Sequence, residues 1–242
     1  MRIYIIILMS LIFSETKLEK SSEGFNYLLS SYVDSLGNVN YKGIIENPFA
    51  LNDYLQFIKK ISPNSHPSYF KSHNSKKAYW INVYNAIILK LMVDNPGENI
   101  LDIGYIGHDV FLKKFKIGGK NLSPLYIENK ILRKMNDPRI HFAINCASKS
   151  CPPLGNRILV ADDLDSQLDK KAYAFINNQS NVYIDYDTNI IYLNRIFKWF
   201  RKDFGDIKTY IFKYLENHNY DEVKNFKIKF FNYDWSMNSI NE

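Results

Sequence analysis

The sequence predicts a single α+β domain, and three observations support this fold class. Segment 78–93 is apolar on nearly every face, which is typical of a buried central helix. Two pairs of short apolar runs flank turn residues, which indicates hairpins. Helical and strand patterns alternate irregularly, without the repeating βαβ series of a doubly wound sheet. We therefore expect the central helix to pack on a small mixed or antiparallel sheet.

The composition of the chain is that of one globular domain. The 242 residues are 46% hydrophobic and carry a formal net charge of +6, and such a chain can bury a large core. Its basic residues are scattered, without the dense blocks of a nucleic-acid tail or a polybasic membrane anchor. No repeat or linker divides the chain. We expect one domain over 25–240 that binds no nucleic acid.

The N-terminus has the pattern of a signal peptide. Two residues, Met1 and Arg2, precede an eleven-residue apolar run at 3–13, which is too short to span a bilayer comfortably. We expect residues 1–14 to be removed and 15–24 to be a flexible N-terminus. The protein is then exported to the periplasm or outside a bacterium, with no stable membrane span. A retained N-terminal anchor is the alternative, because the small-residue pattern at the cleavage site is poor.

The first third of the chain predicts helices. Apolar residues recur at helical spacing over 25–33 and over 51–61. The buried helix 78–93 follows, and on it Asn82 and Asn85 lie one turn apart. Buried unpaired amides cost about 1–3 kcal/mol each. These two must therefore bind either the backbone of a neighbouring element or the polar groups of a site.

A glycine pair predicts a hairpin within 111–122. Gly118 and Gly119 accept positive φ at both central positions of a two-residue turn. Ser123 then caps a helix, and Pro124 opens it without loss of a hydrogen bond.

Glu128 lies near the centre of an apolar face of that helix. The face is formed by Leu125, Ile131, Leu132 and Met135. A buried carboxylate requires a cation or several donors, and otherwise changes its protonation. Glu128 is therefore a candidate functional residue, with a structural ion pair as the alternative.

The rest of the chain predicts both element types. The expected elements are a buried strand at 139–145, an amphipathic helix at 164–176, a hairpin at 182–186 and 190–193, helices at 195–204 and 207–215, and a strand at 226–233.

The segment 141–154 carries both cysteines of the chain. Cys146 and Cys151 follow His141, and such a group can form a thiolate–imidazolium nucleophile, a zinc site or a disulfide beside a core histidine. In a regular strand His141 and Cys146 point to opposite faces, so their meeting requires a bend near Asn145. The helical turn expected at Cys151 favours a thiolate there as well.

Five separated stretches of the sequence resemble one family. They are Trp-Ile-Asn-Val-Tyr-Asn-Ala at 80–86, Leu-Ser-Pro-Leu-Tyr-Ile-Glu at 122–128 with Ile131-Leu132-Arg133, the segment 141–154, Ile-Phe-Lys-Trp-Phe at 196–200 with Asp203-Phe204, and Tyr-Asp-Trp-Ser-Met-Asn at 233–238. Through them the sequence resembles the family catalogued as domain of unknown function 547, over residues 25 to 240.

The resemblance implies a domain often exported in bacteria, with a histidine, cysteine and glutamate site. The matching residues are His141, Cys146 or Cys151, and Glu128. The substrate-binding or orienting candidates are Trp80, Asn82, Asn85 and Asn145. A buried helix beside a histidine-bearing strand is also reminiscent of papain-like and transglutaminase-like folds, which place cysteine at the start of that helix.

The favoured hypothesis is thiol-dependent acyl transfer on a peptide or amide, without a cofactor. A cysteine, preferably Cys146, is the nucleophile, His141 deprotonates it, and Glu128 holds the other ring nitrogen. Asparagine amides or backbone N–H groups stabilise the oxyanion. One alternative is a zinc site of both cysteines and the histidine. The other is a non-enzymatic extracellular binding domain with a Cys146–Cys151 disulfide.

Overall fold

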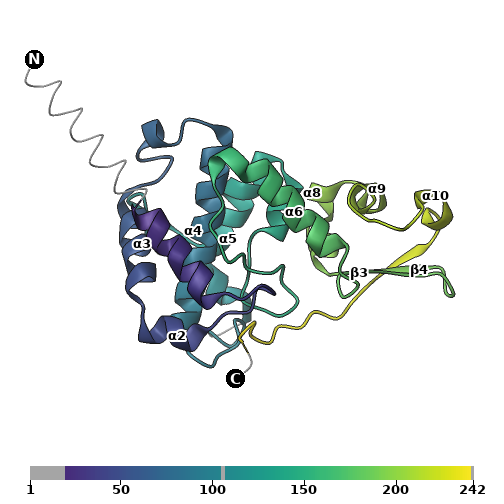
Figure 1. The fold of residues 1–242 in the computed structure, drawn as a ribbon, viewed down its shortest axis with the longest axis horizontal. Helices are drawn as coiled ribbons and strands as arrows, with labels where there is room; N and C mark the ends of the chain where they lie inside the picture. The colour runs from purple at the N-terminus through teal and green to yellow at the C-terminus, as the bar shows by residue number, and fades with distance from the viewer. Residues whose placement is uncertain (1–19, 105–106, 241–242) are drawn as a thin grey trace, which may run out of the picture.

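Helix α4 (His73–Asp94) forms the centre of the fold. The computed structural model describes residues 20–104 and 107–240, and Figure 1 shows their arrangement. The Ser72 and Ser75 side chains form a capping box at the start of α4, which satisfies otherwise unpaired N–H groups. Nearly every residue from 77 to 92 is buried. The predicted central helix is confirmed.

Other helices surround α4. The chain is helical from 20 to 32, and α2 (Tyr41–Glu46) and α3 (Phe49–Lys60) follow. On another side lie α5 (Pro124–Tyr126), its π-helical continuation Ile127–Leu132, and α6 (Leu164–Ile176). The main contacts of α4 are with α2, α3, the π-helical turn Ile127–Leu132 and the 3-10 turn Ala161–Asp163, and α5 and α6 also contact it. The expectation that α4 packs on a sheet is therefore wrong, because helices cover its apolar surface.

Both predicted hairpins are present. Strands β1 (Phe115–Ile117) and β2 (Lys120–Leu122) pair antiparallel around Gly118 and Gly119, whose φ angles are 54° and 83°. Strands β3 (Val182–Asp185) and β4 (Ile190–Leu193) pair antiparallel, and β5 (Lys227–Phe230) joins β4 in parallel. The mixed sheet and the α+β class are confirmed.

Short helical turns complete the fold. They are α7 (Ile196–Trp199), α8 (Arg201–Phe204), α9 (Ile207–Ile211), α10 (Tyr220–Val223), and the 3-10 turns Pro67–Tyr69, Gly107–Leu112, Arg133–Met135, Pro138–Phe142 and Ala161–Asp163. The single helix expected over 195–204 is thus two turns that end at Gly205, whose φ is 69°. The helix expected over 207–215 ends early, at Ile211.

Two apolar cores meet at the segment that follows Pro138. The larger core surrounds α4 and includes Ile140 and Ile144. The second core lies between the mixed sheet, α6 and α7–α9, and it includes Phe142. Ile140 and Ile144 thus pack into one core and Phe142, between them, packs into the other. The backbone of this segment is therefore fixed from both sides. The cysteine-containing loop begins directly after it.

The expected strand at 139–145 is wrong. Residues Pro138–Phe142 form a 3-10 helix, with Asp137 as the N-cap and proline at the first position. A short apolar run cannot by itself distinguish a strand from a buried helical turn. The alternation argument about His141 and Cys146 therefore does not apply.

Two expectations concern the N-terminal part of the chain. The predicted signal peptide 1–14 lies outside the described residues. Of the segment 15–24, expected to be flexible, residues 20–24 are helical, and Ser21 donates a hydrogen bond to Asp53. Within the described residues, no helix has both the length and the apolar character needed to cross a membrane.

The C-terminal segment 231–240 returns from the sheet across the molecule. Figure 1 shows it running from β5 back toward α2. Backbone hydrogen bonds join Val39 to Asn238 and to Ile240, and the Asn238 side chain accepts a hydrogen bond from the Tyr41 hydroxyl at 2.7 Å. The segment is therefore held against the N-terminal half and passes beside the cysteine loop.

Candidate functional site

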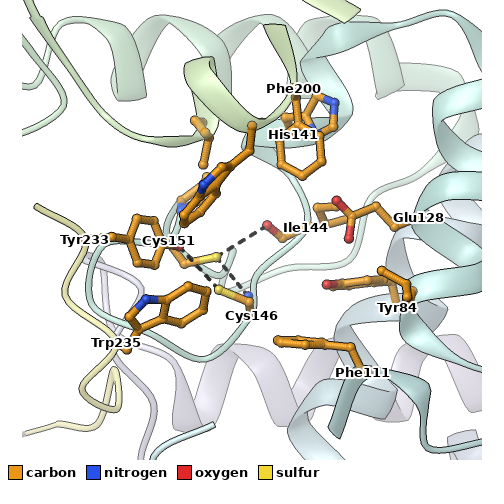
Figure 2. Close-up of a pocket in the computed structure, with 14 residues that line it drawn as sticks. Tyr84, Phe111, Glu128, His141, Ile144, Cys146, Cys151, Phe200, Tyr233 and Trp235 are labelled. Carbon is orange, nitrogen blue, oxygen red and sulfur yellow. Dashed lines mark hydrogen bonds between the residues drawn. The ribbon is translucent and has the colours of Figure 1, made fainter. Parts of the chain in front are cut away.

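A cavity of about 370 Å³ lies where the two cores meet. Its acidic, imidazole and thiol side chains are Glu128, His141, Cys146 and Cys151. The remaining wall is mainly aromatic, with Tyr84, Phe111, Trp199, Phe200, Tyr233 and Trp235 (Figure 2). The structure thus brings all four residues predicted to be catalytic to one cavity.

The loop that carries Cys146 is held by a buried amide of α4. The Asn85 side chain donates to the carbonyl of Ala143 at 2.9 Å and accepts the Asn145 N–H at 2.9 Å. The Asn145 side chain in turn donates to the Pro152 carbonyl and accepts the Ala147 N–H, both at 2.8 Å. Asn85 and Asn145 therefore fix both ends of the loop and act as positioning residues.

The other two predicted orienting residues lie elsewhere. Asn82 makes the same pair of bonds as Asn85, but with the backbone of Leu159, at 2.8 and 3.0 Å. Trp80 is 2% exposed and packs edge-on against Tyr79. Neither lines the cavity. Both buried amides thus bind backbone, so the oxyanion role considered for Asn82 and Asn85 does not fit the structure.

The Cys146 sulfur contacts two hydroxyl groups. Its Sγ lies 3.1 Å from Oγ of Ser148 and 3.4 Å from the hydroxyl of Tyr233. Burial raises the pKa of the Cys146 thiol, but hydrogen bonds from Cys151, Ser148 and Tyr233 outweigh burial, so that the pKa is lowered overall. Cys146 is therefore the cysteine suited to be a thiolate.

Cys151 lies next to Cys146 and differs in its surroundings. Its Sγ accepts the backbone N–H of Cys146 at 2.9 Å, and both thiols are free. Burial raises the pKa of Cys151, and so does the neighbouring Cys146. The structure therefore contains two adjacent thiols and not the disulfide of the alternative interpretation.

Glu128 reaches the cavity from the π-helical turn. Ile127 and Leu132 supply the buried side chains of this turn, whereas Leu125, which the sequence places on the same apolar face, is 42% exposed. In Figure 2 the Glu128 carboxyl group points into the cavity above Tyr84. Burial and the charges of Cys146 and Asp203 raise the pKa of Glu128 to about 7, against the lowering effects of Arg133 and Tyr84. Glu128 can therefore gain and lose a proton near neutral pH.

His141 pairs with Asp203, which sequence reasoning did not assign. Nε2 of His141 lies 2.8 Å from Oδ2 of Asp203, and Arg133 donates two hydrogen bonds to the same carboxylate, at 2.6 and 2.8 Å. The expected bond from Glu128 to the ring is not formed. Burial lowers the pKa of His141 to about 4, although Asp203 acts to raise it. The ring is therefore neutral at pH 7.

His141 also makes no hydrogen bond to a thiol. Its Nδ1 is buried without a partner, and the ring stacks on Phe200 with centroids 3.9 Å apart. Because the neutral ring donates from Nε2 to Asp203, its lone pair is on Nδ1. The expected thiol–imidazole pair is therefore not formed, and Glu128 is the acidic residue of the cavity whose pKa is raised by the charge of Cys146.

The C-terminal segment supplies the side of the cavity that faces both sulfur atoms. Trp199, Tyr233 and Trp235 pack together, with ring centroids 4.5 to 5.7 Å apart. Backbone bonds from Lys149 and Ser150 hold 234–236 against the cysteine loop. Asp203 and the three rings were part of the recognised motifs, but spacing along the chain gave no sign of their contact with the cysteines.

The zinc alternative does not fit this geometry. Across the described ranges, no three His, Cys, Asp or Glu side chains are grouped so that they could hold a metal ion. The His141 ring is hydrogen-bonded to Asp203, and the Cys151 sulfur accepts the backbone N–H of Cys146. The residues proposed as zinc ligands therefore do not form a site.

The fold and the site define an α+β domain with a thiol pair in an aromatic-lined cavity. Residues 68–176 match the family model described as "Protein of unknown function, DUF547", and over this segment the chain is similar to that family. The match contains Glu128, His141 and both cysteines, whereas Tyr233 lies beyond it. Neither the comparison with curated proteins nor that with solved structures gave a match, so the likeness to papain-like and transglutaminase-like folds stays a prediction.

Proposed function

We propose that the protein is a thiol-dependent acyl-transfer enzyme in which Cys146 is the nucleophile. It acts on peptide or amide bonds, as a peptidase, an amidase or a transpeptidase. The observation that carries the proposal is the position of the Cys146 sulfur, which meets two hydroxyl groups in a cavity that also contains Glu128. A stabilised thiolate and an acid that titrates near neutrality are the two groups that such a reaction requires.

Glu128 takes the proton-transfer role that was expected of His141. At neutral pH a proton on Glu128 leaves Cys146 as the thiolate, and the Cys146 sulfur forms a bond to the substrate carbonyl carbon. The carbon–nitrogen bond then breaks, and the departing amine takes the proton from Glu128. Water or an acceptor amine next attacks the acyl carbon and gives a proton to the Glu128 carboxylate. The carbon–sulfur bond then breaks, which releases the acyl product and restores the Cys146 thiolate.

Tyr233 is the donor best placed for the oxyanion. The N–H groups of Cys146 and Ala147 are bound to Cys151 Sγ and Asn145 Oδ1, so they are not available. The Tyr233 hydroxyl lies 3.3 Å from Oγ of Ser148 and 3.4 Å from the Cys146 sulfur. Once that sulfur has bonded to the substrate carbon it no longer carries a negative charge, and the Tyr233 proton can be donated to the oxyanion. Burial, Cys151 and Cys146 all raise the pKa of Tyr233, so it remains a donor at neutral pH.

The cavity wall indicates the kind of acyl group. Apart from Glu128, His141 and the thiols, the wall is apolar or aromatic, and its volume of about 370 Å³ suits a small or medium group. We therefore expect substrates with an apolar acyl part. The signal-like sequence at 1–14 supports action in the periplasm or outside the cell.

Trapping of an acyl-enzyme tests the proposal. Wild type, Cys146→Ser and Glu128→Gln are treated with p-nitrophenyl acetate, and each protein is analysed by intact mass. We expect an acetyl group on Cys146 in wild type and none in Cys146→Ser. Glu128→Gln should still be acetylated but release the group about 10²–10⁴-fold more slowly, because the acid–base group is lost. Acetylation of Cys146→Ser at the wild-type rate would overturn the proposal.

A further inference from the structure

Cys146 and Cys151 are within reach of one another and of a molecule in the cavity. The Cys146 N–H donates to Sγ of Cys151 at 2.9 Å, and the two side chains lie next to each other in Figure 2. Both side chains line the cavity, as Figure 2 shows, and neither residue is fully buried. A compound that reacts with one sulfur is therefore close to the other.

The loop between the cysteines is fixed by internal hydrogen bonds. The Cys151 N–H bonds to the carbonyl of Ser148 at 3.1 Å, and Asn145 bridges to Pro152 and Ala147. Ala147 has a φ of 63°, which costs a residue with a Cβ atom about 1–2 kcal/mol. Such strain persists only where the surroundings determine the conformation. The fold thus sets the spacing of the thiols.

The two sulfur atoms have unequal chemistry. Two hydroxyl groups face Cys146, whereas the Cys151 sulfur meets the Cys146 N–H and, at 3.9 Å, the Ile144 carbonyl. The pKa of Cys146 is lowered by its hydrogen bonds, and that of Cys151 is raised by burial and by Cys146. This is the division between an attacking thiolate and a second thiol that reacts after it.

We propose that Cys146 and Cys151 form a thiol–disulfide exchange pair that reduces small organic disulfides entering the cavity. The Cys146 thiolate attacks one sulfur of the disulfide, forms a mixed disulfide and releases the other half as a thiolate. Cys151 loses its proton to that thiolate and attacks the Cys146 sulfur, which releases the second thiol. The products are two small thiols and a Cys146–Cys151 disulfide, and the two electrons come from the cysteine pair. This reaction is independent of acyl transfer.

The test uses bis(2-hydroxyethyl) disulfide, a small neutral probe, with the full chain in its reduced form. The wild type, Cys151→Ser and Cys146→Ser are sampled over time, quenched with acid and analysed by intact mass. We expect the wild type to lose two hydrogens without a lasting adduct, and Cys151→Ser to keep one 2-hydroxyethylthio group on Cys146. Cys146→Ser should react at least about tenfold more slowly at pH 7, because its remaining thiol is less ionised.

Two outcomes would overturn the inference. One is a wild-type protein that keeps the mixed disulfide as long as Cys151→Ser does. The other is a Cys146→Ser variant that reacts as fast as wild type. Thermal melting of both variants shows that they are folded. Because no acyl substrate is present, failure of acyl transfer leaves this result intact, and an acyl-enzyme without disulfide formation would leave only the proposed function standing.

Discussion

Asn85 and Asn82 offer a matched test of how α4 positions the cysteine loop. Each side chain is buried, and each makes two hydrogen bonds to the backbone of a distant segment. Only the partners of Asn85 belong to the segment that leads into Cys146. Replacement of either residue by alanine removes similar interactions, so the two variants separate a loss of stability from a loss of positioning.

The magnitude follows from the groups left without partners. Asn85→Ala leaves the Ala143 carbonyl and the Asn145 N–H buried and unpaired, at about 1–3 kcal/mol each. We expect a loss of about 2–6 kcal/mol in the free energy of unfolding, and a similar loss for Asn82→Ala. In urea this appears as a lower transition midpoint with an unchanged slope.

The two variants should differ in thiol chemistry. The rate of Cys146 alkylation by iodoacetamide is measured against pH in conditions where both variants are folded. We expect Asn85→Ala to change the rate and its pH midpoint, because the loop loses its anchor, and Asn82→Ala to retain the wild-type profile. Equal profiles for all three proteins, or an Asn85→Ala variant as stable as wild type, would refute the reasoning.

Three further predictions test other parts of the account. The pKa of His141 is about 4 in the folded protein and about 6.5 when unfolded, so its contribution to stability is complete above pH 6.5 and is lost as pH falls to 4. His141→Gln should remove about 3 kcal/mol of the acid sensitivity seen in urea titrations at pH 7 and pH 4, and an unchanged sensitivity would contradict this. Tyr233→Phe should raise the pH midpoint of Cys146 alkylation by about one unit, because a hydrogen bond to a charged group contributes about 1.5 kcal/mol, and a midpoint equal to that of wild type would count against the contact. Gly118→Ala should destabilise more than Gly119→Ala in thermal melting, because a Cβ atom at Gly118 would lie 2.0 Å from a serine hydroxyl and one at Gly119 meets nothing within 4 Å, and equal losses would show that only the positive φ matters.

Local signals predicted much of the fold. The apolar run of α4 and the glycine pair between β1 and β2 each determine one element through nearby residues, and both elements are present. The strand expected after Pro138 failed because tertiary packing decides between a strand and a turn for a short apolar run. The N-cap Asp137 followed by a proline was the signal for the helical turn.

The candidate site was predictable in its composition and not in its pairing. Glu128 was found because a carboxylate interrupts an apolar face, and the cysteines because they are adjacent in sequence. The partner of His141 is Asp203, 62 residues later in the chain, and Tyr233 approaches Cys146 only through the path of the C-terminal segment. Such contacts depend on the arrangement of whole elements, which periodicity does not encode.

The most direct test of the account is the pH dependence of Cys146 alkylation in wild type and Glu128→Gln, measured by intact mass. In wild type the negative charges of Glu128 and Cys146 oppose one another, so the rate should rise gradually across neutral pH as two coupled groups titrate. In Glu128→Gln we expect a steeper rise, as for one group, at lower pH. Superimposable profiles would show that Glu128 and the Cys146 sulfur do not interact, and the proposed acid–nucleophile pair would be wrong.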